Sequence, residues 1–219
     1  MARAKAMIES AETIDEVPAL LEAAKNELAL ATDCACEAFA DLNPDSWYHD
    51  AVDYTVSHGL FKGVDGTRFA PKATMTRGML VTVLYRFAGE PEVDADAAFE
   101  DVAPNHYYSK AVAWAQANGL VKGIDAKHFA PNVPVTRQQL VAIFYRYAAL
   151  MGYDTSASAD LSAFTDAGSV QAYAREAMAW AVGIGLVNGR SATRLEPSGL
   201  ATRAEAAAIF TRFVENVIL

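Results

Sequence analysis

The stretch FADLNPDSWYHDAVDYTVSHGLFKGVDGTRFAPKATMTRGMLVTVLYRFAG occupies residues 39–89. Residues 99–149 then read FEDVAPNHYYSKAVAWAQANGLVKGIDAKHFAPNVPVTRQQLVAIFYRYAA, at a constant offset of 60. The register holds without a gap from Phe39 to Arg86. A third, looser copy begins at Phe164 and contains one inserted residue. This internal repeat decides the architecture, because copies of one sequence pattern form copies of one structural unit.

Each copy predicts a helix, a loop and a second helix. The first helix starts near an aromatic pair, Trp47-Tyr48 in copy one. Short polar side chains before the pair are expected to cap it, namely Asp45 or Ser46 in copy one and Asn105 in copy two. Each first helix is expected to end at a glycine, which adopts the left-handed conformation without strain: Gly59, Gly119 and Gly185.

The second helix of each copy is predicted to start at a threonine cap, with capping boxes at Thr136-x-x-Gln139 and Thr202-x-x-Glu205. Apolar residues recur along it at i, i+3, i+4 and i+7, as in Leu80, Val83, Leu84 and Phe87 of copy one. Three equivalent helices can bury these stripes on one another. A single unit of about 50 residues buries too little apolar surface alone, so we expect the copies to fold as one body.

The repeats also predict the domain organisation. An amphipathic pattern indicates a helix within an N-terminal segment or spacer, residues 1–36. The three repeats are then assigned to residues 37–92, 93–158 and 159–219.

The composition is that of a globular protein with an acidic surface. The 219 residues are 53% hydrophobic and carry a formal net charge of −9. This charge argues against nucleic acid and anionic lipid as partners. No stretch approaches the roughly 18 apolar residues of a membrane span, and no signal peptide is evident. We expect a fragment of a longer exported protein, with no cofactor.

Two cysteines, Cys34 and Cys36, form a C-x-C pair in the connecting segment. One intervening residue makes an internal disulfide strained, so two thiols are the expected state. Two thiols alone do not make a zinc site, and no histidine lies at ligand spacing in the sequence. No metal site is therefore predicted.

The pattern that the three copies follow, each with departures, resembles the S-layer homology family. Its elements are F-x-D, an aromatic pair, A-V, G-L-x-x-G, F-x-P and T-R-A-E, over roughly residues 37–219. The resemblance implies a mainly α fold: three helix–loop–helix repeats in a pseudo-threefold spindle with a central three-helix bundle. It also implies a non-catalytic, extracellular module that anchors its host protein to a secondary cell-wall polysaccharide, commonly a pyruvylated one, through grooves between repeats.

The strongest binding candidates are Arg77, Arg137 and Arg203, each at the first position of a second helix. A cation there is unfavourable for the helix dipole. Free backbone N–H groups beside a guanidinium would instead form a site for a carboxylate such as a ketal-linked pyruvate. The family motif assigns the same arginine to the ligand. A second recurring set lies in the last helical turn, where a cation suits the dipole, and is interpreted as structural: Arg86, Arg146 and Arg212.

Three further sets recur and keep two interpretations each. The aspartates accept hydrogen bonds from sugar hydroxyls or cap a turn: Asp41, Asp101 and Asp166. The aromatics stack on a sugar ring or pack in the core, and helical spacing favours the core: Trp47, Tyr107 and Tyr173. The glycines let the backbone approach a ligand or only form the turn: Gly63, Gly123 and Gly189.

Only copy three has the complete T-R-A-E motif, since Met79 and Gln139 stand where copy three has Glu205. We therefore expect unequal grooves. No catalytic motif is present, which argues against an enzyme. A calcium loop starting at Asp41 lacks the glycine and glutamate that such a loop needs. A protein-interaction or self-assembly module on the same fold stays the main alternative.

Overall fold

The structure, a computed structural model, describes residues 34–93 and 97–218. This part of the chain is mainly helical and has isolated β-bridges but no strand, which confirms the predicted fold class. None of its helices combines the length and apolar character needed to span a membrane. The helices are α3 (Ala35–Ala38), α4 (His49–Ser57), α5 (Arg77–Phe87), α6 (Ser109–Ala117), α7 (Arg137–Leu150), α8 (Arg175–Gly183) and α9 (Arg203–Phe213), with 3₁₀ turns η2 (Ala167–Ser169) and η3 (Ala172–Ala174) and a π-turn η4 (Val214–Ile218).

The chain divides into two compact units, Met1–Ala70 and Pro71–Leu219. The boundary falls inside the first repeat, so that α4 belongs to the first unit and α5 to the second. All three second helices therefore belong to the second unit. The division into four sequence segments stays a prediction, and the helix predicted before Cys34 lies outside the described residues.

In the first unit, helix α4 and the loop after it surround a small aromatic core. Phe69 is fully buried and lies 6.0 Å from Phe39 and 5.9 Å from Phe61, measured between ring centroids. Before this core, Cys34 and Cys36 are joined as a disulfide across a Cα–Cα distance of 5.2 Å. The expectation of two thiols is thus wrong for this structure, in which Cys34 caps α3 and Cys36 lies in the first turn of that helix.

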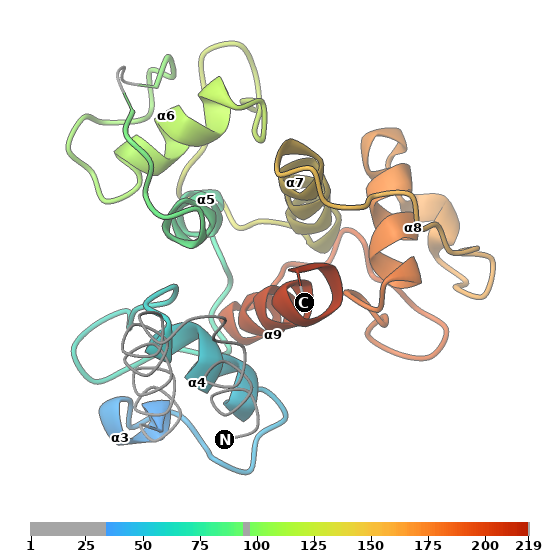
Figure 1. Ribbon diagram of the computed structural model, residues 1–219, viewed down its shortest axis with the longest axis horizontal. Helices are drawn as coiled ribbons and strands as arrows, with labels where there is room; N and C mark the ends of the chain where they lie inside the picture. Colours follow the sequence, from blue (N-terminus) through green and yellow to red (C-terminus); the bar gives the residue numbers. More distant parts are fainter. Residues whose placement is uncertain (1–33, 94–96, 219) are drawn as a thin grey trace, which may run out of the picture. The chain divides into compact units, whose positions relative to one another are not determined.

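In the second unit, helices α5, α7 and α9 form a three-helix bundle, as predicted (Figure 1). Helix α6 lies outside α5, and α8 lies outside α7. The bundle core is aromatic. Phe144 packs edge-on against Phe210 at 4.6 Å, and Phe213 and Tyr147 lie 5.9 Å apart. All four rings are almost fully buried, which confirms the apolar stripes read from the sequence.

A ring of backbone hydrogen bonds joins the segments that enter the three bundle helices. The N–H of Met75 donates to the carbonyl of Ala201 at 2.8 Å, and Ala201 donates to Val135 at 3.0 Å. The N–H of Val135 donates back to Met75 at 2.8 Å. Each repeat thus supplies one donor and one acceptor, and the ring fixes the N-terminal ends of α5, α7 and α9 relative to one another.

The helix caps agree with the sequence at the second helices and differ at the first. Thr136 and Thr202 form complete capping boxes, and Thr76 makes half of one, as predicted. Helices α4 and α6 instead begin after tyrosines that make no side-chain cap, so the caps expected at Asp45, Ser46 and Asn105 are wrong. The three predicted terminating glycines have positive φ: Gly59 at 68°, Gly119 at 68° and Gly185 at 72°.

Candidate functional site

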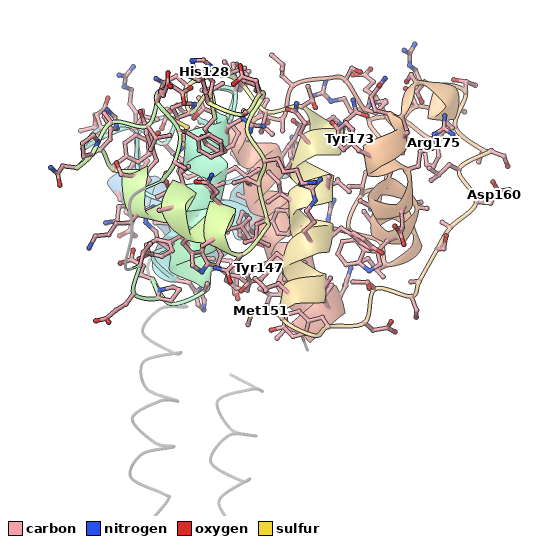
Figure 2. All side chains as sticks on the ribbon, turned by 90° about the horizontal axis from the view of Figure 1, so that it is seen from above. His128, Tyr147, Met151, Asp160, Tyr173 and Arg175 are labelled. Atoms are coloured by element: carbon pink, nitrogen blue, oxygen red, sulfur yellow. A yellow bond between two sulfur atoms is a disulfide. The ribbon has the colours of Figure 1, made fainter. Side chains whose placement is uncertain are left out.

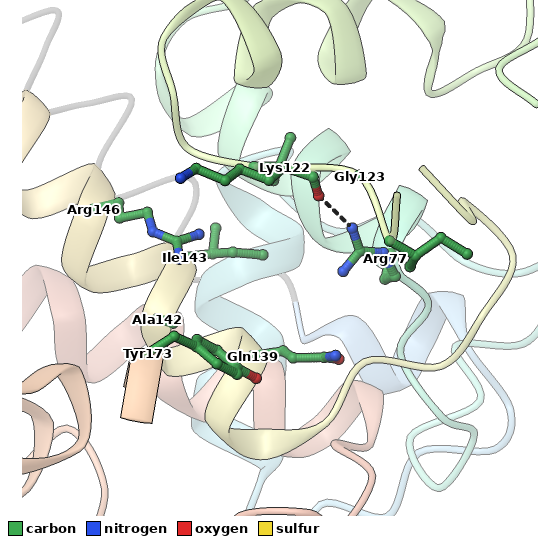
Figure 3. Close-up of a pocket in the computed structure, with 10 residues that line it drawn as sticks. Arg77, Lys122, Gly123, Gln139, Ala142, Ile143, Arg146 and Tyr173 are labelled. Atoms are coloured by element: carbon green, nitrogen blue, oxygen red, sulfur yellow. Dashed lines mark hydrogen bonds between the residues drawn. The ribbon is translucent and has the colours of Figure 1, made fainter. Parts of the chain in front are cut away.

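A cavity of about 460 Å³ opens in the second unit between α5, α7 and the segment before α8 (Figure 3). Its cationic lining residues come from three places: Arg77 from the start of α5, Lys122 from the loop after α6, and Arg146 from α7. None of the described lining residues is acidic, and the others are Val121, Gly123, Ile124, Gln139, Ala142, Ile143 and Tyr173. The cavity is therefore locally cationic in a chain whose formal net charge is −9.

Figure 2 places this site at one end of the second unit. The labelled side chains of Tyr173 and His128 lie toward that end, whereas Tyr147 and Met151 lie at the opposite, C-terminal end of α7. The site therefore shares its end with the N-termini of the bundle helices, where the ring of backbone hydrogen bonds also lies.

Arg77 is held against the protein backbone. Its Nε donates to the carbonyl of Phe129 at 2.8 Å, and a terminal nitrogen donates to the carbonyl of Lys122 at 3.0 Å. The guanidinium carbon lies 4.6 Å from the ring centroid of Phe129. The residue is only 8% exposed, and burial lowers the pKa of the guanidinium. Arg77 thus organises the cavity wall as well as facing into the cavity.

The expected contribution of free helix N–H groups is wrong. The N–H groups of Arg77 and Gly78 donate to the carbonyls of Val133 and Pro131, and the N–H of Met79 donates to the Thr76 hydroxyl. The first N–H groups of α7 and α9 are bonded to carbonyls in the same way. An anion in the cavity would therefore meet cationic side chains and not the end of a helix.

Arg146 and Tyr173 complete the opposite wall. Arg146 donates to the carbonyl of Leu120 at 3.0 Å and also lines the cavity, so its purely structural interpretation was too narrow. Tyr173 is 52% exposed, and desolvation raises the pKa of its hydroxyl while Arg146 and Arg77 oppose that rise. Core packing is wrong for all three predicted aromatics, because Trp47 and Tyr107 are also exposed, at 68% and 54%.

The corresponding position one repeat later differs in its charges. Arg137 occupies the place of Arg77 and donates from Nε to the carbonyl of Leu195 at 2.9 Å. Glu205 replaces Gln139 and lies 3.5 Å from the Arg137 guanidinium. Arg190 replaces Ile124 and bonds both Glu205, at 3.1 Å, and Glu196, at 3.0 Å. Protein carboxylates thus satisfy the cations that an anionic ligand would meet here.

The third equivalent arginine, Arg203, is also buried, at 5% exposure. Its backbone N–H donates to the carbonyl of Ala73 at 2.9 Å. The glutamate two residues later, Glu205, caps Thr202 and pairs with Arg137 and Arg190. The last-turn Arg212 donates to the carbonyl of Leu186 at 3.4 Å, as Arg146 does to Leu120.

The three predicted aspartates shape loops. Asp101 accepts the N–H groups of Phe129 at 2.8 Å and Ala130 at 2.7 Å, and Ala130 has a φ of 60°. The same pair of contacts recurs at Asp41 with Phe69 and Ala70, and at Asp166 with Leu195 and Glu196. Burial opposes ionisation of Asp166, yet these N–H donors hold its pKa below the ordinary value. The contacts support the turn-capping interpretation.

The three predicted glycines fit their turns closely. A Cβ on Gly189 would lie 2.7 Å from the carbonyl oxygen of Ser191, and one on Gly63 or Gly123 would meet the carbonyls of Asp65 or Asp125. The turn interpretation therefore accounts for all three, and Gly123 also lines the cavity. Of the predicted site residues, the cavity unites Arg77, Gly123 and Tyr173. Sequence reasoning missed Lys122 and Gln139, although both stand at fixed positions in the repeat.

Comparison with known proteins places this geometry in a family. The family model described as the S-layer homology domain matches residues 38–78, 98–141 and 163–207, together more than half of the chain. The chain belongs to the S-layer homology domain family. The three matched segments follow the three repeats, and Arg77 and Arg137 lie at or near the ends of the first two.

The relatives of this S-layer homology chain include structural proteins and enzymes. It is 33% identical over 181 residues to the surface-layer 125 kDa protein of Lysinibacillus sphaericus, which covers 81% of this chain and 15% of that protein. It is 30% identical over 173 residues to exoglucanase XynX of Acetivibrio thermocellus, a match that covers 78% of this chain and 16% of that protein. It is 28% identical over 113 residues to the cellulosome-anchoring protein of the same organism, a match that covers 49% of this chain and 25% of that protein. The chain thus corresponds to a small part of each relative.

Proposed function

We propose that this chain is a non-catalytic module that anchors an exported protein to the bacterial cell wall by binding a secondary cell-wall polysaccharide. Its relatives include a surface-layer protein and a cellulosome-anchoring protein. The match to a named exoglucanase covers only 16% of that enzyme, which supports a shared accessory segment. The cationic cavity at Arg77, in a chain of opposite net charge, carries the proposal because it selects an anionic group locally.

The ligand group that suits the cavity best is a carboxylate on a sugar, such as a pyruvate ketal. Arg77 is fixed by the carbonyls of Phe129 and Lys122, so little side-chain entropy is lost when its remaining donors bind an anion. Lys122 and Arg146 add charge from two other walls. The exposed ring of Tyr173 offers a face for the apolar side of a sugar ring.

The cavity at Arg77, here called the first groove, and the equivalent position at Arg137, called the second groove, are expected to differ in affinity. At Arg77 the facing residue is the neutral Gln139, whereas at Arg137 it is Glu205, which is already paired with Arg190. An anion entering the second groove would have to displace a carboxylate from those cations. We therefore assign the polysaccharide carboxylate to the Arg77 groove.

The first experiment compares purified wall sacculi with sacculi stripped of the secondary polymer and with pyruvate-depleted sacculi. Binding to the first alone is the expected result. Binding that persists on bare peptidoglycan, or that never appears, would move the function toward a protein partner on the same fold. The amount of unbound chain left in solution and the thermal unfolding of the chain are measured in parallel, so that a loss of binding can be distinguished from a loss of folded protein.

A matched pair of variants tests the groove. Arg77→Ala removes hydrogen bonds to the carbonyls of Phe129 and Lys122, whereas Arg137→Ala removes one to Leu195 and the ion pair with Glu205, so that each loses two polar contacts. Their structural cost should therefore be similar. We expect Arg77→Ala to weaken polymer binding about tenfold or more, the value of one charge-assisted contact, and Arg137→Ala to leave it nearly unchanged. Equal losses in both variants would contradict the assignment to one groove.

A lysine pair provides a second test with less structural effect. Lys122→Ala removes a cavity cation, whereas Lys110→Ala removes the same charge from α6, outside the cavity lining. Only the first should reduce binding, and the loss should shrink at high salt because the contact is electrostatic. Equal effects of both would indicate bulk charge and not a site.

A further inference from the structure

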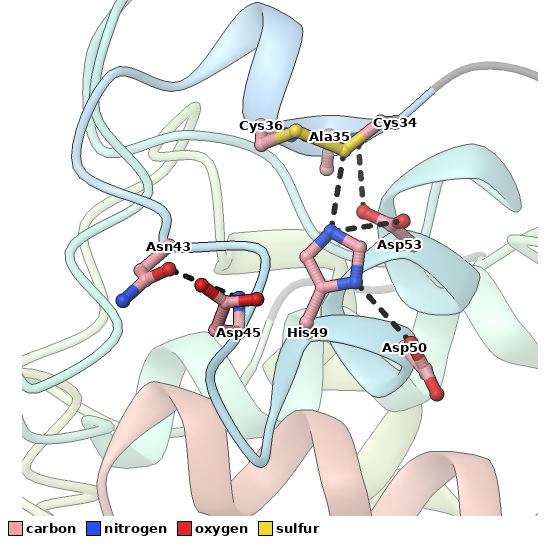
Figure 4. Close-up of a disulfide and its surroundings, with 8 residues drawn as sticks. All are labelled: Cys34, Ala35, Cys36, Asn43, Asp45, His49, Asp50 and Asp53. Atoms are coloured by element: carbon pink, nitrogen blue, oxygen red, sulfur yellow. Dashed lines mark hydrogen bonds and ion pairs between the residues drawn. A yellow bond between two sulfur atoms is a disulfide. The ribbon is translucent and has the colours of Figure 1, made fainter.

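A cluster of potential metal ligands lies in the first unit, remote in sequence from the cavity (Figure 4). The Sγ of Cys34 lies 3.2 Å from Nε2 of His49. The ligand atoms of Cys34, Cys36 and His49 all lie within 4.8 Å of one another. The three side chains are partly exposed, so solvent reaches them. Polysaccharide binding uses none of these groups.

The cluster is built by two helices that hold each other in place. Asp53 on α4 accepts the backbone N–H of Ala35 at 2.9 Å, which fixes the start of α3 against α4. His49 lies one turn before Asp53 on the same face of α4, with Nε2 3.5 Å from the carboxylate. A carboxylate oxygen of Asp50 lies 3.2 Å from the other ring nitrogen, Nδ1, and accepts its proton when that nitrogen carries one. The imidazole is thus aimed at the sulfur atoms by contacts on both sides.

The spacing of these atoms suits a tetrahedral thiolate–imidazole site. Zn–S bonds of about 2.3 Å and Zn–N bonds of about 2.0 Å place sulfur and nitrogen ligands roughly 3.5 Å apart. The Cys34–His49 separation of 3.2 Å is close to this value. The backbone N–H of Cys36 also points at the Cys34 sulfur, at 3.3 Å, and favours its thiolate. Two cysteines and one histidine leave a fourth position for water or another ligand.

We propose that the reduced form of Cys34 and Cys36, together with His49, binds a thiophilic divalent cation of the Zn²⁺ class. A dithiol first reduces the Cys34–Cys36 disulfide by thiol–disulfide exchange. The dithiol is oxidised to a disulfide, and the protein is left with two thiols. The cation then binds both sulfurs and Nε2 of neutral His49, and the two thiol protons pass to solvent. A disulfide compound then reoxidises the cysteines: its own sulfur–sulfur bond breaks to give two thiols, the Cys34–Cys36 bond re-forms, and the cation is released. The site is therefore open to metal only in the reduced state.

This assignment departs from the absence of a metal site expected from the sequence. The sequence shows no histidine at ligand spacing beside the cysteines, because His49 lies fifteen residues after Cys34. The fold brings them together through the pairing of α3 and α4. The disulfide and the metal-bound form exclude each other, because a sulfur atom in a disulfide cannot act as a thiolate ligand.

The test is an anaerobic titration of the reduced full chain with Co²⁺, a spectroscopic substitute for Zn²⁺. We expect one equivalent to bind with thiolate charge-transfer bands and the strong visible bands of a tetrahedral site, and Zn²⁺ to displace it. The oxidised chain should show none of these bands. Thiolate bands absent from the reduced chain, or equal in both redox states, would overturn the proposal.

Variants separate the three-ligand site from chelation by thiols alone. His49→Ala should weaken Co²⁺ binding about tenfold or more and change the visible bands, since one inner ligand is lost. His58→Ala, at the end of the same helix, is the matched control and should bind as the parent chain does. Unchanged binding in His49→Ala overturns the site. If His49→Ala does not fold, the proposal is tested by NMR on the reduced parent chain. Zn²⁺ should shift the ring resonances of His49 and leave those of His58 unchanged.

Discussion

Glu205 holds Arg190 with two charge-assisted hydrogen bonds, from Nε to Oε1 and from a terminal nitrogen to Oε2, each at 3.1 Å. The same carboxylate accepts the backbone N–H of Thr202 at 2.8 Å. One side chain thus completes a helix cap and neutralises a neighbouring groove. The motif glutamate of the third repeat thus pairs with the arginine of the second repeat, Arg137.

Replacing Glu205 by glutamine should open the second groove. The amide can keep the cap, as Gln139 does for Thr136 at 3.0 Å, but it no longer neutralises Arg137 and Arg190. We expect polymer affinity to rise about fivefold, which corresponds to roughly 1 kcal/mol. The free energy of unfolding should fall by about 1–2 kcal/mol because the ion pairs are lost. Isothermal titration and chemical denaturation measure both, and unchanged affinity would contradict the neutralisation argument.

The reverse exchange, Gln139→Glu, should close the first groove. The new carboxylate keeps the capping box, as Glu205 does, and faces Arg77 and Arg146 across the cavity. We expect polymer affinity to fall about fivefold or more, since a like charge then meets the ligand carboxylate. Helix stability should stay within about 0.5 kcal/mol of the parent chain. Affinity that rises in this variant would rule out an anionic ligand in the cavity.

Removing Asp101 should destabilise the second repeat. Asp101→Ala leaves the N–H groups of Phe129 and Ala130 without their acceptor. We expect a loss of about 1–3 kcal/mol in the free energy of unfolding, seen as a lower midpoint in urea. Asp101→Asn keeps one acceptor oxygen and should lose less. If both variants lost the same free energy of unfolding, the two oxygens of Asp101 would not each be accepting one of these N–H groups.

A glycine at position 130 should stabilise the protein. Ala130 has a φ of 60°, a left-handed conformation that costs a residue with a Cβ about 1–2 kcal/mol. Ala130→Gly relieves this strain but adds about 0.5–1 kcal/mol of entropy to the unfolded chain. A net gain of up to about 1 kcal/mol is expected in thermal or urea unfolding. Ala142→Gly, inside α7, is the control and should destabilise.

His128 should titrate above its usual range. The side-chain hydrogen bond and charge of Asp125, 2.9 Å away, raise the pKa of the imidazole. The cationic form is the one that Asp125 stabilises, so the pair forms at lower pH and is lost as pH rises through the raised pKa. Proton NMR titration of the ring measures this pKa. Asp125→Asn should bring it back to the ordinary range, and an unshifted value in the parent chain would contradict the pair.

The fold was readable from the sequence because its signals are local. The repeat register, the threonine caps at Thr136 and Thr202 and the apolar stripe of the second helices each involve residues a few positions apart. Helical periodicity and capping preferences follow from the backbone geometry of one segment. The first-helix caps failed because aromatic packing at Tyr108 and its neighbour Tyr107 begins α6 without a side-chain cap.

The site was only partly readable because its contacts cross between repeats. Arg77 bonds carbonyls 45 and 52 residues later in the chain, so its fixed geometry has no local signature. Glu205 caps its own helix, as its spacing from Thr202 predicts, but its ion pairs with Arg137 and Arg190 have no local signature in the sequence. Unequal grooves were predicted from the missing glutamates. That difference stays a prediction. The residue that faces Arg77 is the neutral Gln139, whereas the equivalent position beside Arg137 holds Glu205.

The hydrogen-bonded ring of Met75, Val135 and Ala201 is closed on itself, with each N–H and each carbonyl already used. Stacked repeat proteins have two ends, grow by adding units, and need special terminal units to cover them. A ring of three has no end. A fourth copy would find no donor or acceptor there, and a lost copy would leave one of each exposed. The number of repeats in this ring is therefore fixed at three by closure.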